Sequence, residues 1–384
     1  MKAKSIKGKT AEEIEAALKN SMADGFQPTL AIVFISIKQD RKTVCEILHL
    51  RKMDVIGATS CGEFTDGFQS EGSIVILLMD LNRNYYRILF EDVGTRPLSD
   101  VAALLAQSAM GEFKRPAFIL CSTGVSLTGE YFSGETLVHS IEKVVGPGVC
   151  IFGGMAGDDA SFTGTYVFTH DHSTDVGIVA LILDEDNISL NGIAISGWKP
   201  LGTTKTVTKS EDGWVYSIDG QPALDMYLRY LGEKPASGNE TVKIFEELGF
   251  YYPFIAIDAG DPVIRTPLMI DKEKGAIKLD FPVAEGKKLQ FSMPPDFDII
   301  ENVLSSANEI KTSTQSDAEA LLIFSCAGRH SVLGPLVSAE NEGLHEIWKA
   351  PMAGFFTYGE YGKGTEGKQQ FHSTTCSWVA LKEK

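Results

Sequence analysis

The sequence feature that most constrains the fold of this chain is an order of segments that occurs three times. Each occurrence has an apolar strand-like segment, a helix-like segment, a second apolar segment, a glycine followed by an acid, and a last apolar segment. The first segments are 31–36, 117–123 and 320–326, and the glycine–acid pairs are Gly62-Glu63, Gly157-Asp158 and Gly359-Glu360. Wholly apolar strands joined by a helix are typical of parallel pairs that are buried on both faces.

This repetition predicts an α/β protein with internal βαββ-type pseudo-repeats and mixed sheets flanked by helices. Other material lies between the second and third repeats. A strand is expected over 187–198, a hairpin over 204–220 with its turn at Asp212-Gly213, and a helix over 222–231 that ends at Gly232. Strand-like segments follow, so the C-terminal portion is predicted to be mixed α/β but rich in β-structure.

Breaks in these patterns suggest a division of the chain. We predict an N-terminal helical extension over 1–28, one domain over 29–220 and a second over 221–384. In the extension, Thr10 is a candidate N-cap with Glu13 three residues later. Residues 234–240 (KPASGNE) are the most linker-like stretch.

Charge and composition exclude several classes of protein. The 384 residues include 35 Lys and Arg against 51 Asp and Glu, a net charge of −16, and no basic block offsets it. Such a chain repels nucleic acids and anionic lipid. No apolar run approaches the 18 or more residues of a membrane-spanning helix, and no signal peptide is apparent. The six scattered cysteines are typical of a reduced, cytoplasmic protein.

Phosphate-binding and hydrolase motifs are incomplete in this chain. The glycines at 153, 154 and 157 have the wrong spacing for a dinucleotide loop, and Gly124-Val125-Ser126 lacks the last glycine of a nucleophile elbow. The histidines form no metal-binding motif, and His170-Asp171-His172 is interpreted as a polar loop.

Several polar residues directly follow apolar strands, where α/β sheets bind ligands. Arg329 suits a carboxylate or phosphate, while Glu63, Asp158 and Glu360 suit an ammonium group. Together they describe a receptor for a zwitterion, provided that the fold brings them together. The alternatives are a salt bridge for Arg329 and satisfied turns for the acids.

The chain resembles the FIST family, whose members pair a FIST N with a FIST C domain. The strings that carry the resemblance run from about residue 28 onward and are in the family's order. They include GATSCGEF (57–64), FGGMAGDDASFTGTYVF (152–168), GWKPLG (197–202), VYSIDGQPALDMYLRYLG (215–232), FSCAGRHSVLG (324–334) followed by Glu340, PMAGFFTYGEYG (351–362) and FHSTT (371–375).

The resemblance implies a cytoplasmic, non-enzymatic sensory module of signal transduction. Its ligand would be a small molecule, such as an amino acid or a similar polar metabolite, and its output would pass through a separate partner. The predicted ligand-binding residues are Arg329, Glu360, Tyr358 and Thr123, with Asp158 and Glu63 as second choices.

Two other functions stay open. Similar proteins are associated with haem and nitric oxide sensing through a partner histidine kinase, so haem is an alternative cofactor. A hydrolase-like enzyme could instead use Cys326, with His330 nearby, or Ser122 or Ser126 as nucleophile. No catalytic set and no metal site is predicted, and the sequence identifies neither the ligand nor the oligomeric state.

Overall fold

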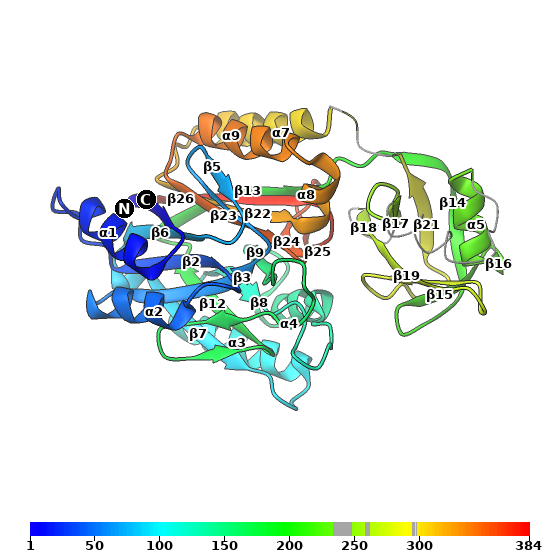
Figure 1. Ribbon diagram of the computed structural model, residues 1–384, viewed down its shortest axis with the longest axis horizontal. Helices are drawn as coiled ribbons and strands as arrows, with labels where there is room; N and C mark the ends of the chain where they lie inside the picture. The colour runs from blue at the N-terminus through cyan, green and yellow to red at the C-terminus, as the bar shows by residue number, and fades with distance from the viewer. Residues whose placement is uncertain (233–247, 258–261, 294–295, 297) are drawn as a thin grey trace.

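The computed structural model describes residues 1–384 except 233–247, 258–261, 294–295 and 297. The described chain has a main body and an inserted subdomain (Figure 1). The main body contains one arrangement three times: an edge strand, a helix, two parallel strands joined by a helical crossover, a short hairpin and a last strand. The predicted α/β class and its pseudo-repeats are therefore confirmed.

The three units follow one another along the chain. The first comprises β1 (Lys2–Gly8), α1 (Ala11–Ser21), β2 (Leu30–Ser36), α2 (Arg41–Leu50), β3 (Asp54–Ser60), β4 (Glu63–Thr65), β5 (Phe68–Ser70) and β6 (Ile74–Asp80). After the short helix η1 (Arg83–Tyr85), the second comprises β7 (Tyr86–Asp92), α3 (Leu98–Glu112), β8 (Pro116–Ser122), α4 (Gly134–Val145), β9 (Ile151–Met155), β10 (Val167–Phe168), β11 (Ser173–Thr174) and β12 (Gly177–Asp184). The third comprises β13 (Ile188–Ile195), α7 (Asp298–Thr314), β22 (Ala320–Cys326), α8 (Ala327–Leu333), α9 (Leu336–Trp348), β23 (Met352–Thr357), β24 (Glu360–Lys363), β25 (Gln369–His372) and β26 (Cys376–Glu383).

Each unit gives its hairpin to another unit's sheet. Hairpin β4-β5 pairs with β23, hairpin β24-β25 pairs with β9, and hairpin β10-β11 pairs with β3. The three sheets consequently have the same order: β1-β6-β2-β3-β10-β11, β7-β12-β8-β9-β24-β25 and β13-β26-β22-β23-β4-β5. This cyclic exchange gives the main body a pseudo-threefold arrangement and ties its first and last units together.

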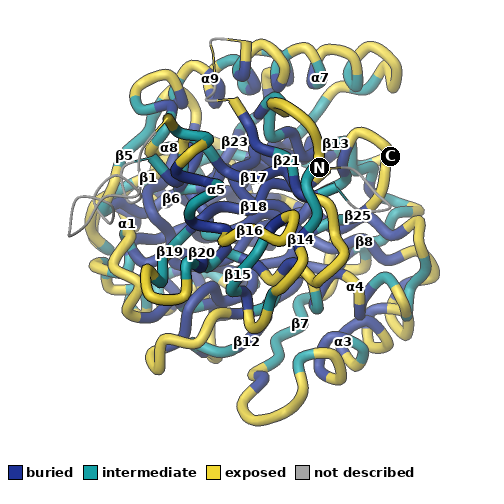
Figure 2. Tube along the Cα trace, turned by 90° about the vertical axis from the view of Figure 1, so that its right-hand side faces the viewer, coloured by how far each residue is buried: buried dark blue, intermediate teal, exposed yellow. Residues whose placement is uncertain are grey.

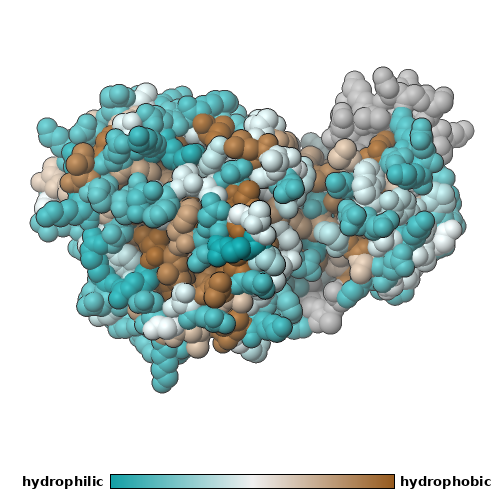
Figure 3. All heavy atoms as spheres, turned by 90° about the horizontal axis from the view of Figure 1, so that it is seen from below, coloured by the Kyte–Doolittle hydropathy of each residue, from teal (hydrophilic) through white to brown (hydrophobic). Residues whose placement is uncertain are grey.

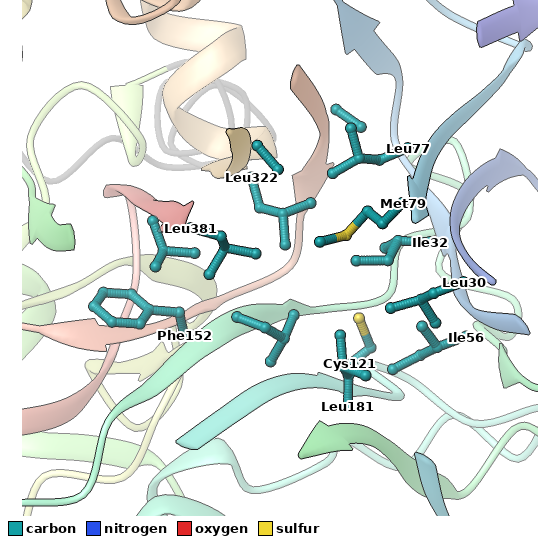
Figure 4. Close-up of a cluster of buried hydrophobic side chains, with 14 of the residues drawn as sticks. Leu30, Ile32, Ile56, Leu77, Met79, Cys121, Phe152, Leu181, Leu322 and Leu381 are labelled. Atoms are coloured by element: carbon teal, nitrogen blue, oxygen red, sulfur yellow. The ribbon is translucent and has the colours of Figure 1, made fainter. Parts of the chain in front are cut away.

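The core lies where the three sheets face one another. Residues 30–35 of strand β2 are all apolar because both faces of the strand are buried. Leu30, Ile32 and Phe34 enter the central cluster, while the alternate residues pack against α1 and α2. Figure 4 shows side chains from all three sheets meeting in this cluster. Helices cover the outer faces, and Figure 2 shows buried strands between more exposed helices such as α3 and α7.

The inserted subdomain, residues 200–292, lies between β13 and α7 and is an antiparallel structure with one described helix. It comprises β14 (Pro200–Glu211), β15 (Trp214–Ile218), β16 (Gln221–Pro222), α5 (Ala223–Tyr230), β17 (Phe254–Ile257), β18 (Val263–Arg265), β19 (Pro267–Asp271), β20 (Ala276–Leu279) and β21 (Lys288–Ser292). The turn at Asp212-Gly213 has positive φ at both residues, 48° and 81°, which confirms the hairpin. The predicted linker, 234–240, lies outside the described residues.

The N-terminal segment differs in part from its prediction. Helix α1 begins at Ala11 after Thr10, whose side chain accepts from the backbone of Glu13, as the capping pattern predicts. The residues before it form strand β1 instead of helix, because they pair along β6 and bury Ile6. The division into domains at residue 220 stays a prediction.

Candidate functional site

The glycine–acid pairs occupy equivalent places in the three units. In the parallel pairs, Ser60, Met155 and Thr357 lie opposite the last residues of β2, β8 and β22. Three residues after each of these positions comes the acid: Glu63, Asp158 or Glu360. All three acids are buried. The repeat noticed in the sequence is thus a repeated turn between a parallel strand and the exchanged hairpin.

Glu63 stabilises the first of these turns through hydrogen bonds. Its carboxylate accepts from the Ser60 hydroxyl, from the Ser73 amide at 2.9 Å and from the Ser73 hydroxyl at 2.7 Å. Burial raises the pKa of Glu63 to about 7, although these hydrogen bonds act in the opposite direction. The acid therefore links the start of β4 to the start of β6.

Glu360 repeats this arrangement in the third unit. It accepts from the Thr357 hydroxyl at 2.5 Å and from the Thr375 amide at 3.2 Å. Burial raises the pKa of Glu360 above that of an ordinary glutamate. Because the hydroxyl stands three residues before the acid in both units, both contacts are explained by the fold without a ligand.

Asp158 has different partners because Met155 provides no hydroxyl. Its carboxylate accepts from the amides of Phe162, Thr163 and Gly164 at 3.0, 2.6 and 3.0 Å, and from the Tyr358 hydroxyl. Burial opposes ionisation, but these bonds outweigh it and lower the pKa of Asp158. The Tyr358 ring stacks on Phe162, with centroids 4.7 Å apart.

The loop that Asp158 organises has an unusual backbone. Asp159, Ala160 and Phe162 have φ values of 53°, 59° and 52°, in the left-handed region that favours glycine. Such conformations cost free energy and are frequent at binding sites. Of the six predicted site residues, the structure brings Asp158 and Tyr358 into direct contact, beside this loop.

Arg329 is engaged in a buried ion pair. Its Nε lies 3.1 and 3.2 Å from the two Glu340 carboxylate oxygens, and its Nη2 lies 2.5 Å from one of them. Its Nη1 donates to the Ser196 carbonyl at 2.5 Å. Arg329 and Glu340 are both 0% exposed, so the guanidinium joins α8 to α9 inside the protein. A ligand carboxylate would have to displace Glu340.

Thr123 and the candidate nucleophiles also have internal partners. The Thr123 hydroxyl accepts from the Gly177 amide at 3.1 Å. Ser122 shares a hydrogen bond of 2.6 Å with the Tyr361 hydroxyl, and Ser126 one of 2.8 Å with Thr128. Burial raises the pKa of the Cys326 thiol, which disfavours the reactive thiolate. These contacts account for each side chain without a substrate.

His330, the other candidate catalytic residue, packs against an aromatic ring. Its imidazole stacks on Phe356 with centroids 4.2 Å apart, and burial lowers its pKa. No cluster of three potential metal ligands occurs among the residues that the structure describes.

A cavity of about 480 Å³ lies between the main body and the inserted subdomain. The subdomain contributes residues from β17, β18 and β21 and the loop before β21, and the main body contributes α4 and β25. The lining residues are Glu135, Thr136, Val138, His139, Glu142, Ala256, Ile257, Val263, Arg265, Pro282, Val283, Ala284, Lys287, Lys288, Gln369, Gln370 and Phe371. Figure 3 shows the two parts as distinct masses that meet at a narrower waist.

Contacts around this cavity join the two parts. The rings of Phe281 and Phe371 meet edge to face with centroids 4.3 Å apart. The hydroxyls of Thr266 and Thr374 are 3.0 Å apart, and Trp198 Nε1 donates to the Tyr251 carbonyl at 3.3 Å. None of the six predicted site residues lines this cavity.

Sequence reasoning missed the charged lining residue Arg265. It ends β18 after two apolar residues, and it is 5% exposed. A cation within a short apolar strand was the available signal, since arginine is seldom buried without an anionic partner.

A second cavity of about 480 Å³ lies beside the loop between β10 and β11. The predicted polar loop His170-Asp171-His172 contributes to its lining, together with Arg83 and Arg87. Asp171 lies 2.8 Å from His172, and His170 stacks on His49 with centroids 4.3 Å apart.

Comparison with known families agrees with this architecture. Residues 29–221 match the FIST N domain and residues 223–363 match the FIST C domain. The chain belongs to the FIST family. FIST proteins form a sensory family, and the resemblance seen in the sequence is thereby confirmed.

One curated relative of this FIST chain is an uncharacterized protein, MJ1623, of Methanocaldococcus jannaschii. It is 26% identical over 241 residues, which cover 61% of this chain and 44% of the relative. The matched part is thus less than half of that relative's length. In the described part of the FIST chain, no helix combines the length and the apolar character needed to cross a bilayer.

Proposed function

We propose that this FIST protein is a cytoplasmic sensor of a small polar metabolite, such as an amino acid, which binds in the cavity between the main body and the inserted subdomain. The observation that carries the proposal is the cavity itself: its volume of about 480 Å³ suits a small ligand, and both parts of the protein line it. Six free, buried cysteines are consistent with a reducing compartment.

The position of the cavity suggests how binding is signalled. A ligand that contacts α4 and β25 on one side and β17 and β18 on the other stabilises one relative pose of the two parts. Binding then shifts the population toward that pose. A separate signalling protein, such as a histidine kinase, would recognise the change.

The proposal is tested by thermal-shift and calorimetric screening against the amino acids and related metabolites. The variant His139→Trp fills the cavity from the exposed side of α4, so it should weaken any response at least tenfold. Lys143→Trp is the matched control, since Lys143 is on the same helix but does not line the cavity. If the two variants respond equally to the ligand, the ligand does not bind in this cavity.

We propose a second location for the ligand, at the residues that the sequence predicted. These residues are Arg329, Glu360, Tyr358, Thr123, Asp158 and Glu63. This location is centred on the contact between Tyr358 and Asp158, because the strained loop beside them is half open to solvent at Phe162. Tyr358→Phe removes the hydroxyl that donates a hydrogen bond to Asp158 and keeps the aromatic ring. Loss of a ligand response in this variant, with the response of His139→Trp unchanged, would favour this location over the cavity.

The haem and hydrolase alternatives have separate tests. A haem sensor should acquire a Soret band on reconstitution and lose it when one histidine is substituted. A Cys326 hydrolase should react rapidly with iodoacetamide at neutral pH, whereas a buried thiol of raised pKa reacts slowly.

A further inference from the structure

Arg265 is the most unusual side chain in the lining of the cavity. Its side chain is 6% exposed, and among the described residues its Nε has no hydrogen-bond partner. Nη1 donates to the neighbouring Ile264 carbonyl at 3.0 Å. Leaving a guanidinium N–H buried and unpaired is costly, so an acceptor is expected in the cavity.

The anions near Arg265 do not satisfy it. Glu135 comes within 3.6 Å of Nη2, but its side chain is 61% exposed, so solvent screens the pair. Asp280 is only partly buried, and it acts on Arg265 electrostatically, but no hydrogen bond joins the two side chains. Its Oδ2 is buried and also has no partner among the described atoms. The Nε–H of Arg265 is therefore buried without an acceptor among the described residues.

Gln369 lines the same cavity and supplies a complementary group. Its Nε2 donates to the Ile151 carbonyl at 3.0 Å, which assigns the amide orientation. Its Oε1 is buried and has no partner within the described structure. Two lining residues thus carry a cationic N–H donor and a neutral acceptor that have no partners among the described residues. These two groups suit a ligand with a carboxylate and a hydrogen-bond donor.

We propose that Arg265 is the carboxylate-binding residue of this cavity, that Gln369 accepts from a donor group of the same ligand, and that Glu135 is displaced from the guanidinium on binding. This inference rests on the proposed ligand-sensing function and specifies the ligand class as small organic acids. A guanidinium favours a carboxylate because two N–H groups can bind its two oxygens.

The experiment compares acids with uncharged counterparts. Calorimetry and thermal shift are run on the full chain with a panel of amino acids, hydroxy acids and dicarboxylates, each beside its methyl ester or primary amide. A carboxylate that binds should bind at least tenfold more tightly than its amide. Arg265→Gln should abolish this preference, while Arg51→Gln, a distant surface arginine in a 3.5 Å ion pair with Glu15, should leave it intact.

In a second variant, Glu135→Gln, the affinity for carboxylates should rise instead of fall. Glu135→Gln removes the competing anion, so carboxylate affinity should rise severalfold without loss of stability, because Glu135 is exposed. A merely structural role of Arg265 as a partner of Asp280 would produce no such increase.

Three results would overturn the inference. They are equal affinity for an acid and its amide, an acid preference that survives Arg265→Gln in folded protein, and a panel in which no carboxylate binds. If uncharged ligands bind and His139→Trp blocks them, the sensor function stands and the carboxylate assignment fails. If nothing in the panel binds, both fail.

Discussion

At the scale of single residues, the buried charged groups of the main body have internal partners that serve the fold. Arg329 is the clearest case, because Glu340 and the Ser196 carbonyl already occupy its guanidinium. Its side chain and that of Glu340 are fully buried, so removing either leaves an uncompensated charge in the interior.

Arg329→Ala should therefore lower the free energy of unfolding by about 3–5 kcal/mol. Urea unfolding followed by circular dichroism measures the loss. The double variant Arg329→Met with Glu340→Leu removes both charges and should recover most of it. A loss below about 1 kcal/mol in Arg329→Ala would contradict the buried ion pair.

Glu63 gives a pH dependence whose direction can be stated in advance. Its pKa is raised from 4.5 to about 7 in the folded protein, so between these values the unfolded chain releases a proton that the folded protein keeps. Stability contributed by this group is present at low pH and is lost as the pH rises from about 4.5 to 7.

Glu63→Gln abolishes this dependence. Relative to the variant, the wild type should lose roughly 2–3 kcal/mol of stability between pH 4.5 and pH 7.5. Urea unfolding at a series of pH values measures the difference, and the pH-independent cost of the substitution cancels. Parallel stability curves for the two proteins would show that Glu63 has an ordinary pKa.

At the scale of elements, the exchanged hairpins need close contact between strands. Strand β4 lies along β23, where a Cβ on Gly354 would come within 2.0 Å of the Phe64 ring and 2.5 Å of the Ile323 carbonyl oxygen. Glycine is therefore required at this position to let the hairpin of the first unit reach the sheet of the third.

Gly354→Ala should destabilise the protein by about 3 kcal/mol or more, since it overpacks a region that cannot move apart. Gly111→Ala is the matched control: a Cβ there meets nothing within 4 Å, and near the end of α3 it should be neutral or stabilise by up to about 1 kcal/mol. Thermal unfolding compares the two. Similar melting temperatures would indicate that β4 can separate from β23 at little cost.

At the scale of the whole molecule, the inserted subdomain meets the main body around the cavity and also through Ile255 and Ile264, which join a buried apolar cluster of the third unit. The Phe281–Phe371 pair is the main aromatic contact between the two parts among the described residues. Interfaces of this kind allow relative motion of the parts.

Phe281→Ala should loosen the subdomain without unfolding the main body. We expect faster amide hydrogen exchange in α4 and β25 and weaker binding of any cavity ligand. Met269→Ala, on the exposed part of β19, is the control and should leave both unchanged. Unchanged exchange in Phe281→Ala would mean that other contacts hold the subdomain.

The local patterns of the sequence predicted the elements of the repeat well. The parallel pairs, the hairpin at Asp212-Gly213 and the helix after Thr10 follow from apolar periodicity, turn chemistry and capping, which act over a few residues. Strand β1 was missed because its strand character depends on pairing with β6, about 70 residues away. The partner of Arg329 was also open, because Glu340 lies on the next helix and only the packing of α8 against α9 brings the two side chains together.

The sequence by itself determined that three related α/β units exist and that each has an acid after a glycine. Only the tertiary structure decided what those acids do, since a carboxylate's role depends on which donors surround it and on how much water is excluded. It also decided the exchange of hairpins and the cavity beside Arg265. Both arise where distant segments pack together, and such contacts leave no periodic signal along the chain.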